Sequence, residues 1–371
     1  MKWMSFAVYR RYRPQTVSEL LGQTAITETI KNAAASDRLA HAYLFYGPRG
    51  CGKTSTARII AKLANCEKRL SDPEFKRLGE PCNECRACRE INEGRALDVI
   101  EIDAASNRGI DEIRALKEGI RLSPTSYKYK VFIIDEVHQL TKEAFNALLK
   151  TLEEPPAHAI FILATTEYEK IPATILSRVQ RFGFKKATVK KIVEKLSMIA
   201  KDSNINISPE ALTLIGSAAD GSFRDAESLF DQVTSMEDKE ITLSEVELIL
   251  GKTGDRKIIE LTDKIIKNDL QGALEFLHST DEAGNNLVQL TKDTIHWLRK
   301  ALVLSLNPRI ENLLKEELTE DSFQALKEQA KTLNPQKIAI VLKNLIQTYS
   351  EMRISPFAAI SLEVFLVENL K

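Results

Sequence analysis

A glycine-rich octapeptide of the pattern G-x4-G-K-[ST] is the sequence feature best suited to chemistry. It consists of Gly47, Pro48, Arg49, Gly50, Cys51, Gly52, Lys53 and Thr54, and Ser55 follows it. The glycines let the backbone curl so that its amides point at the β- and γ-phosphates of a nucleoside triphosphate. Lys53 adds a positive charge and the Thr54 hydroxyl can ligate Mg²⁺, whereas the Cys51 side chain takes no part. The pattern predicts a triphosphate-binding loop.

Two acidic residues end a hydrophobic run farther along the chain. Asp135 and Glu136 follow Ile133 and Ile134, so we expect them at the carboxyl edge of a parallel sheet, where ligands bind. Asp135 would hold Mg²⁺ through water, and Glu136 would polarise the attacking water, because phosphoryl transfer depends on strict positioning. Alone, the pair could belong to a solvated loop. Together with the upstream loop, it favours hydrolysis of the nucleotide.

Four cysteines lie between the loop and the acidic pair. Cys66, Cys82, Cys85 and Cys88 have the spacing C-x15-C-x2-C-x2-C. Four thiolates suit tetrahedral Zn²⁺, and the close C-x2-C pairs suit a chelating turn. No neighbouring residue resembles the base of a nucleophile, so we interpret the site as structural. Unligated thiols and an iron–sulfur cluster are the alternatives.

Three further side chains could serve the same nucleotide. Thr165 ends an apolar run, and its hydroxyl could hydrogen-bond the attacking water or the γ-phosphate. Arg178 is better placed to reach the nucleotide of a neighbouring subunit, as an arginine finger does; alone, it would be read as a solvated or helix-capping arginine. Arg224 opens a helix and could fold back onto the γ-phosphate, although a surface arginine near Asp225 is the alternative.

The elements that must position these residues alternate in the first half of the chain. Buried parallel strands are predicted at Ala42–Tyr46, Leu97–Ile102, Val131–Ile134 and Ile160–Ala164, because these runs are short and rich in Ile, Val and Phe. Helices are predicted between them: one follows the loop at Ser55–Leu63, and another is capped by Thr141 and ended by Pro155-Pro156. The pattern is that of a doubly wound α/β fold with a parallel sheet.

The strand signal disappears after about Ala187. Amphipathic helices are predicted at Val189–Lys201, Pro209–Ala219, Phe223–Ser235, Ile258–Ile266, Leu270–Leu277, Leu287–Leu306, Ser322–Thr332, Pro335–Met352 and Phe357–Glu368. We therefore expect three domains: an α/β domain over residues 1–184 that includes the cysteine module at 66–88, a small helical lid over 185–242, and an all-helical domain over 243–371.

Length and charge agree with this division. A chain of 371 residues is too long for one ordinary core. Its 52 basic and 52 acidic side chains exclude nucleic-acid binding by global positive charge but allow a local basic face. No apolar run approaches the roughly 20 residues of a membrane span, and the N-terminus lacks the marks of a signal peptide. We expect a cytoplasmic protein with no membrane partner, where cysteines more often bind metal than form disulfides.

Together these motifs resemble those of AAA+ ATPases and, more narrowly, of the gamma/tau subunits of the bacterial DNA polymerase III clamp loader. The similarity covers most of the chain. Besides the loop, the cysteines and the acidic pair, it includes Tyr9–Thr16, Leu20–Gln23, His41–Phe45, Glu153–Pro156, Ser177-Arg178 and Gly221–Ala226. The cysteine module is the specific part, since the related replication factor C small subunits lack it.

The resemblance implies roles for the matching positions. The segment Val8–Pro14 would hold the adenine of ATP, through Val8, Tyr9, Arg11 and Pro14. Thr165 would be sensor 1, Arg178 the trans-acting finger and Arg224 sensor 2. Arg108 and Arg114, which follow Asp103–Ser106, would contact DNA. The last helical block would be a collar that joins the subunits of a five-membered ring.

The resemblance also implies a function: an ATPase that uses Mg²⁺ and carries Zn²⁺, opens the sliding clamp and loads it onto primer–template DNA. Its partners would be the delta and delta-prime subunits, further gamma/tau copies, the clamp and DNA, within a DNA-directed DNA polymerase holoenzyme whose polymerase site lies elsewhere. The rival interpretations are another AAA+ DNA-remodelling motor, such as a branch-migration helicase, and a non-hydrolysing ring scaffold like delta-prime.

Some features depart from the family pattern. Val179 stands where the family usually has cysteine after Ser-Arg, and the Cys66–Cys82 loop is longer than usual. Neither change removes a residue with a proposed role. The chain stops about where the collar should end, so we expect either a gamma-like form or a truncated tau that lacks the helicase- and polymerase-binding tail.

Overall fold

The computed structural model describes residues 7–106, 118–235, 241–249, 255–315, 318, 320–355 and 357–370. It contains two compact units, one formed by Met1–Ile192 with Ala219–Ser228 and the other by Val193–Ala218 with Leu229–Lys371. The first unit contains every residue of the predicted nucleotide and cysteine sites.

A five-stranded parallel sheet lies at the centre of the first unit, with the strand order β2-β3-β4-β1-β5. The strands are β1 (Ala42–Tyr46), β2 (Val99–Asp103), β3 (Lys130–Asp135), β4 (Ala159–Thr165) and β5 (Gln180–Gly183). The three central strands are buried over almost their whole length, because helices cover both faces of the sheet.

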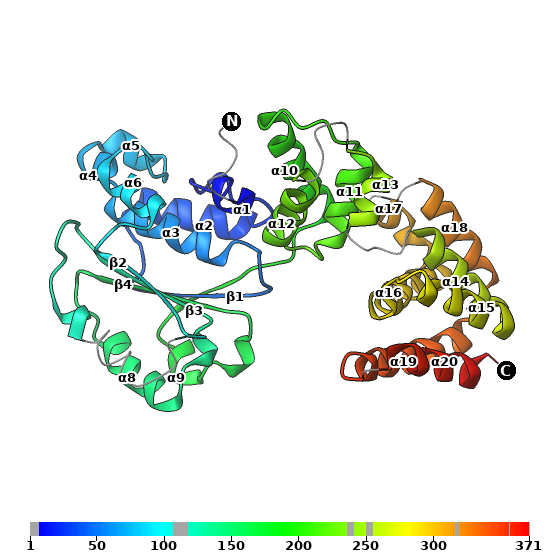
Figure 1. Cartoon of the computed structure of the whole chain (residues 1–371). Coiled ribbons are helices and arrows are strands. Elements are labelled where there is room, and N and C mark those ends of the chain that lie inside the picture. Colours follow the sequence, from blue (N-terminus) through cyan, green and yellow to red (C-terminus); the bar gives the residue numbers. More distant parts are fainter. Residues whose placement is uncertain are drawn as a thin grey trace. The chain divides into compact units, whose positions relative to one another are not determined.

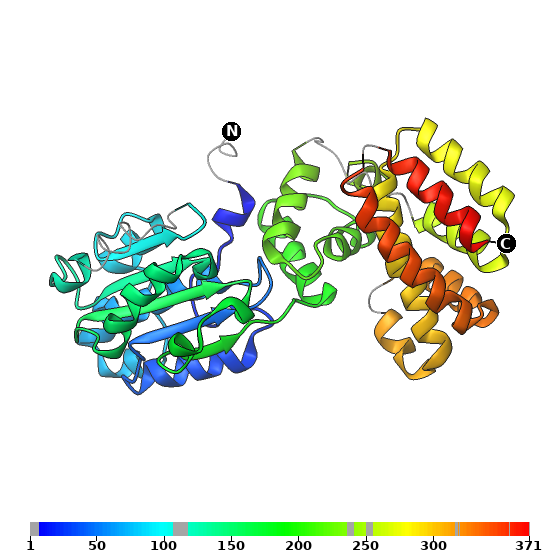
Figure 2. The same ribbon diagram turned by 90° about the horizontal axis from the view of Figure 1, so that it is seen from below.

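Alternate residues of the strands enter two separate hydrophobic cores. Phe45 points to the face covered by α2 (Thr24–Ala35) and α3 (Lys53–Asn65). Leu44 points to the opposite face, where α8 (Lys142–Glu153) and α9 (Ala173–Leu176) pack. Figures 1 and 2 show these two helical layers on either side of the sheet. The predicted α/β architecture with a parallel sheet is confirmed.

Most of the predicted strands are observed close to their expected positions. The strands around Ala42, Val131 and Ile160 differ from prediction by at most one residue at each end. β2 lies farther along the chain than predicted, because Leu97 is exposed and lies before the strand. β5 was not predicted. The Thr141 cap is confirmed, since its hydroxyl accepts a hydrogen bond from the amide of Ala144.

The remaining elements of this unit are short. They are α1 (Val8–Arg11), α4 (Glu67–Ser71), α5 (Pro73–Arg77), α6 (Arg86–Glu93), and two 3-10 turns, η1 (Val137–Gln139) and η2 (Tyr168–Lys170). The three helices between α3 and β2 surround the cysteines, so the insertion is a folded module and not a long loop.

Helices dominate the rest of the chain. They are α10 (Val189–Asp202), α11 (Pro209–Ala218), α12 (Phe223–Thr234), α13 (Leu243–Ile249), α14 (Asp255–Lys267), α15 (Leu270–Glu282), α16 (Leu287–Leu306), η3 (Pro308–Ile310), α17 (Glu311–Lys315), α18 (Glu320–Thr332), α19 (Pro335–Met352) and α20 (Ala358–Asn369). The predicted helices are confirmed, and α16 and α19 have the predicted bounds. Among the described residues, no helix is long and apolar enough to cross a membrane.

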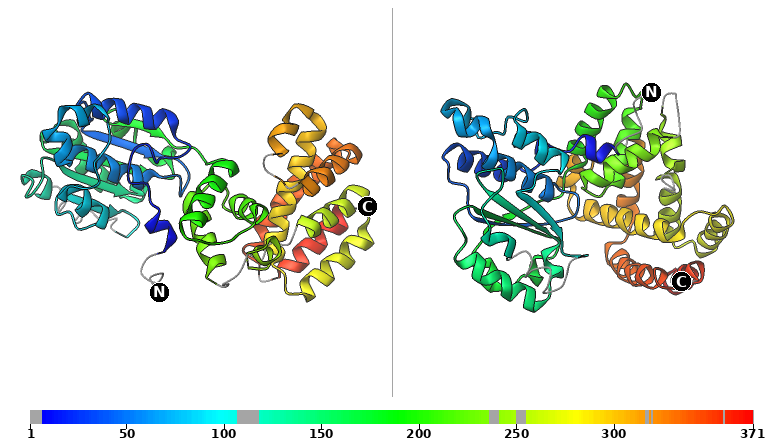
Figure 3. Two further views of the ribbon diagram at one scale, coloured as in Figure 1. Left: turned by 90° about the horizontal axis from the view of Figure 1, so that it is seen from above. Right: turned by 60° about the vertical axis from the view of Figure 1, so that its left-hand side comes forward.

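One hydrophobic core joins the helices from α14 to α20, and α19 lies beside α20 within it (Figure 3). A buried glutamine adds a polar link between three of these helices. Gln329 accepts hydrogen bonds from Trp297 Nε1 (2.8 Å) and Thr262 Oγ1 (3.1 Å), and it donates to the carbonyl of Ile259 (2.9 Å). Because every polar atom of the amide is satisfied, this contact fixes α14, α16 and α18 in one arrangement.

Candidate nucleotide and metal sites

The glycine-rich loop follows β1 directly and leads into α3. Its glycines have the positive φ angles that favour this residue: 140° at Gly47, 73° at Gly50 and 100° at Gly52. At Gly50 there is also no room for a side chain, because a Cβ atom would lie 1.9 Å from Ser222 Oγ. The loop amides and the N-terminus of α3 therefore stand together, the arrangement that binds phosphate.

Lys53 and Thr54, the first residues of α3, face the loop and the end of β3. The buried ammonium of Lys53 donates to the carbonyls of Gly47 (2.7 Å) and Pro48 (2.8 Å). Burial lowers the Lys53 pKa, while the nearby carboxylates act in the opposite direction. The Thr54 hydroxyl donates to Asp135 Oδ2 at 2.7 Å. A hydroxyl and a carboxylate in contact form the oxygen donor set that Mg²⁺ prefers, so the predicted magnesium pair fits this ion.

Glu136 has the left-handed backbone conformation, with φ of 46°, immediately after β3. Its Oε2 accepts hydrogen bonds from both the amide (3.1 Å) and the hydroxyl (2.9 Å) of Thr166. His138 Nδ1 lies 3.3 Å from the same oxygen. Sequence reasoning missed Thr166 and His138, although both adjoin residues that it selected. Together they hold the Glu136 carboxylate at the carboxyl edge of the sheet.

Thr165 is fully buried at the end of β4, next to the loop. Its carbonyl accepts a hydrogen bond from the amide of Gly47 at 3.2 Å. Its hydroxyl lies 2.9 Å from His138 Nδ1 and accepts from the amide of Glu167 at 3.0 Å. Thr165 is therefore connected to Glu136 through His138, which contacts both.

Residues from the two ends of the first unit meet beside the loop. The guanidinium of Arg224, in the first turn of α12, lies 5.0 Å from the centre of the Tyr9 ring, in α1. Arg10 and, to a smaller extent, Arg224 lower the pKa of Tyr9. The amide of Phe223 donates to the carbonyl of Gly50 at 3.1 Å. The structure thus brings the Arg224 turn and the segment around Tyr9 to the loop; this segment also contains the other predicted adenine contacts, Val8, Arg11 and Pro14.

Arg178 lies at the opposite edge of the sheet. Gln180, at the start of β5, pairs with Tyr43 near the start of β1, whereas the loop follows the end of β1. Arg178 lies in the turn before β5, at the amino end of these parallel strands, and the loop lies at their carboxyl end. The guanidinium donates to Glu153 Oε1 (2.6 Å) and to the carbonyl of Thr174 (2.6 Å), and it borders an open cleft of about 700 Å³. Arg178 is thus far from the loop of its own chain. The two predicted DNA contacts, Arg108 and Arg114, lie outside the described residues.

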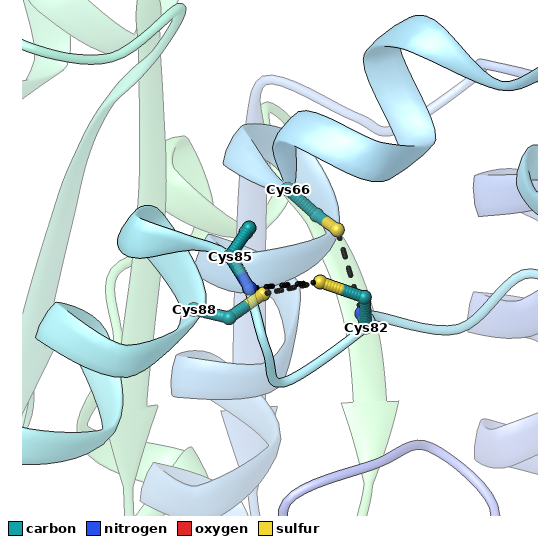
Figure 4. A group of neighbouring side chains, drawn as sticks. All are labelled: Cys66, Cys82, Cys85 and Cys88. Carbon is teal, nitrogen blue, oxygen red and sulfur yellow. Dashed lines mark hydrogen bonds between the residues drawn. The ribbon is translucent and has the colours of Figure 1, made fainter.

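The four cysteines converge in one cluster (Figure 4), with all four sulfur atoms within 4.8 Å of one another. Cys66 follows the last residue of α3, and Cys82, Cys85 and Cys88 lie in the turn before α6 and in its first turn. The Cys82 amide donates to Cys66 Sγ, and the Cys85 amide donates to Cys82 Sγ. The neighbouring thiol of Cys88 lowers the pKa of Cys66, which favours its thiolate form.

This geometry fits a zinc ion. Tetrahedral zinc with bonds of about 2.3 Å holds its sulfur ligands about 3.8 Å apart, and Cys82 Sγ lies 4.0 Å from Cys88 Sγ. Backbone amides that donate to sulfur stabilise the thiolate form that binds metal. The fifth cysteine, Cys51, is buried in the phosphate loop and lies outside this cluster. The predicted ligand set is therefore the one that the structure brings together.

The fold and the nucleotide site define the class of protein: an AAA+ P-loop protein. Its sequence matches family models for the DNA polymerase III delta subunit (residues 22–188), the clamp-loader ATPase lid domain (191–238) and domain III of the DNA polymerase III gamma and tau subunits (241–370). The chain belongs to the gamma/tau family of DNA polymerase III subunits.

Two relatives, one tau and one gamma subunit, agree with this assignment. The chain is 42% identical to the tau subunit of Bacillus subtilis over 98% of its own length, and it spans 62% of that longer protein. It is 34% identical to the gamma subunit of Buchnera aphidicola subsp. Baizongia pistaciae, with 96% of this chain and 95% of that subunit covered. A solved structure of the RuvB branch-migration motor of Thermotoga maritima is 19% identical, covers 69% of this chain and 79% of its own, and has a TM-score of 0.48.

Proposed function

We propose that this chain is an ATP-hydrolysing motor subunit of the DNA polymerase III clamp loader, which opens the sliding clamp and loads it onto primer–template DNA. The observation that carries this proposal is the intact set of Lys53, Thr54, Asp135 and Glu136 around one loop, in a chain of the gamma/tau family. A scaffold subunit that does not hydrolyse ATP has no need of this complete set.

The proposed reaction assigns a task to each group. The loop amides and Lys53 would bind the β- and γ-phosphates, and Thr54 and Asp135 would hold Mg²⁺, which would neutralise phosphate charge. Glu136 would orient the attacking water, and the hydrogen bonds from Thr166 hold its carboxylate in place. Thr165 and Arg224 would contact the γ-phosphate. Thr165 would link it to His138, and Arg224 would link it to α12. Tyr9 and its neighbours Val8, Arg11 and Pro14 hold the adenine.

Arg178 would complete the site of an adjacent subunit. Its position at the sheet edge opposite the loop supports this role, since it stands far from its own nucleotide. In such an assembly the partners are further copies of this chain, the delta and delta-prime subunits, the clamp and DNA, and the helices from α14 to α20 form the collar. The subunit would act in the cytoplasm as part of a polymerase holoenzyme, without a polymerase site of its own.

We also propose that the four cysteines bind structural zinc. Replacing Cys85 with serine should reduce the zinc content from about one ion per chain to a small fraction, because serine does not replace a thiolate ligand. Loss of the metal should lower the free energy of unfolding by more than about 3 kcal/mol. Mass spectrometry of the metal and urea denaturation measure both quantities. Replacing Cys51 with serine is the matched control, and it should keep the metal.

ATP hydrolysis by the reconstituted assembly tests the proposed function. We expect strong stimulation only when the sliding clamp and primer–template DNA are both present. If the rate of ATP hydrolysis were the same with and without the clamp, the result would contradict clamp loading and would favour another AAA+ motor. Absence of hydrolysis despite normal ATP binding would favour a non-hydrolysing scaffold.

A further inference from the structure

Two positively charged side chains are buried near the cysteines and have no role in the proposed reaction. Lys62, on α3, is 1% exposed, and Arg69, on α4, is 3% exposed. A buried charge is unfavourable unless an opposite charge compensates it. Within the described residues their hydrogen-bond acceptors are neutral oxygens, and Nε of Arg69 has no acceptor. Hydrogen bonds alone therefore leave both charges uncompensated.

The cysteine cluster provides compensating charge to both cations. Cys66 and Cys88 interact electrostatically with Lys62 and with Arg69, whereas Glu19 acts on Lys62 alone and Asp37 on Arg69 alone. A divalent ion bound by four thiolates has a net charge of about −2, which matches two buried cations. With a metal bound, the cluster would therefore be a partly buried dianion with two buried cations beside it.

Lys62 also connects the cluster to the N-terminal segment. Its ammonium donates to the Gln15 carbonyl at 2.5 Å and to Asn83 Oδ1 at 2.7 Å. Asn83 has a positive φ of 59° and lies in the turn between Cys82 and Cys85. One ammonium thus joins α3, the metal-binding turn and the backbone of Gln15.

Glu80, two residues before Cys82, holds the same segment by a second set of contacts. Its carboxylate accepts hydrogen bonds from the amides of Val17 (2.7 Å) and Ser18 (3.0 Å), and it pairs with Lys31 at 3.1 Å. Bonds from backbone amides to a carboxylate are among the stronger hydrogen bonds in proteins. Residues 15–18 are therefore fastened at both ends to the module that contains the cysteines.

We propose that the metal-loaded cysteine cluster is an electrostatic anchor that fixes residues 15–18, through Lys62 and Glu80, and thereby positions the adjoining adenine-binding segment. The inference rests on the proposed nucleotide site at Val8–Pro14. Because metal and nucleotide then stabilise the same arrangement, each binds more tightly when the other is bound.

This coupling can be measured without hydrolysis. Zinc-loaded and chelator-treated protein are titrated with a fluorescent ADP analogue, and hydrogen exchange of residues 15–18 is followed in both. We expect metal removal to weaken nucleotide binding at least about fivefold and to speed exchange at 15–18, while the amides of β1, β3 and β4 stay protected. Unchanged affinity and unchanged exchange would overturn the anchor. Failure of the zinc-loaded protein to bind the analogue would instead refute the nucleotide site.

Two variants test the proposal in protein that retains its cysteines. Lys62→Met should lower zinc retention against a chelator about 10- to 100-fold, the usual effect of losing an outer-shell partner. Glu80→Gln should keep zinc but speed exchange at Val17 and Ser18 and weaken ADP binding. Arg77→Met and Glu74→Gln, at exposed positions of the same module, should change neither property. Wild-type zinc retention in Lys62→Met, or wild-type ADP affinity in Glu80→Gln, would overturn the proposal.

Discussion

Replacing Arg178 with alanine should reduce clamp- and DNA-stimulated ATP hydrolysis by about 10³- to 10⁵-fold, the effect of removing an arginine finger in related nucleotide hydrolases. ATP affinity should change little, because Arg178 stands at the sheet edge opposite its own loop. Phosphate release by the reconstituted assembly and a separate ATP titration measure the two quantities.

Two further variants distinguish the proposed role of Arg178 in a neighbouring site from the contacts that it makes within its own chain. Glu153→Gln removes the ion pair with Arg178 and should leave stimulated hydrolysis close to normal. Arg181→Ala removes a nearby arginine of β5 that donates to the Tyr168 hydroxyl, and it too should remain active. If Arg178→Ala kept near-normal stimulated turnover, its role would be confined to the Glu153 pair and the cap on α9.

Glu136→Gln should lower hydrolysis by about 10²- to 10⁴-fold, the range for loss of a general base. The amide has the same shape as the carboxylate and can still accept from Thr166, so the fold and ATP binding should be preserved. Single-turnover hydrolysis and retention of bound ATP on a filter measure the effect.

The matched control for this variant is Glu169→Gln, at an exposed position close in sequence to Thr166. It should hydrolyse ATP at the normal rate. Turnover of Glu136→Gln at the wild-type rate would remove Glu136 from the mechanism. A large loss of ATP affinity would show that its role is in binding.

The strands that could be predicted from the sequence are those whose residues are buried along almost the whole strand. β1, β3 and β4 are apolar along their length, and a run of that kind indicates a strand covered on both faces. β5 was missed because Phe182 is its only buried residue, so an edge strand of this composition resembles a loop. Nothing in local composition marks Leu97 as exposed, which explains the displacement of β2.

Some residues of the candidate sites could also be predicted from the sequence, and others could not. The loop, the acidic pair and the four cysteines could be found because each depends on short spacings that fix the local geometry. The contact between Arg224 and Tyr9 could not be predicted from the residues alone. It forms because the chain, after its last strand, passes next to the phosphate loop again at the start of α12. Lys62 and Arg69 were missed for another reason: lysine and arginine are usually exposed, so their burial is visible only in the structure.

The location of the loop and Arg178 on opposite edges of one sheet gives any assembly of these chains a direction. A contact that places the Arg178 edge of one chain against the loop of the next joins two different surfaces, and the pair keeps one surface of each kind free for further neighbours. A two-fold symmetric pair therefore cannot complete both of its sites through such contacts. With the role proposed for Arg178, the nucleotide site at one end of an open row lacks its arginine, so the number of complete sites is smaller by one than the number of chains.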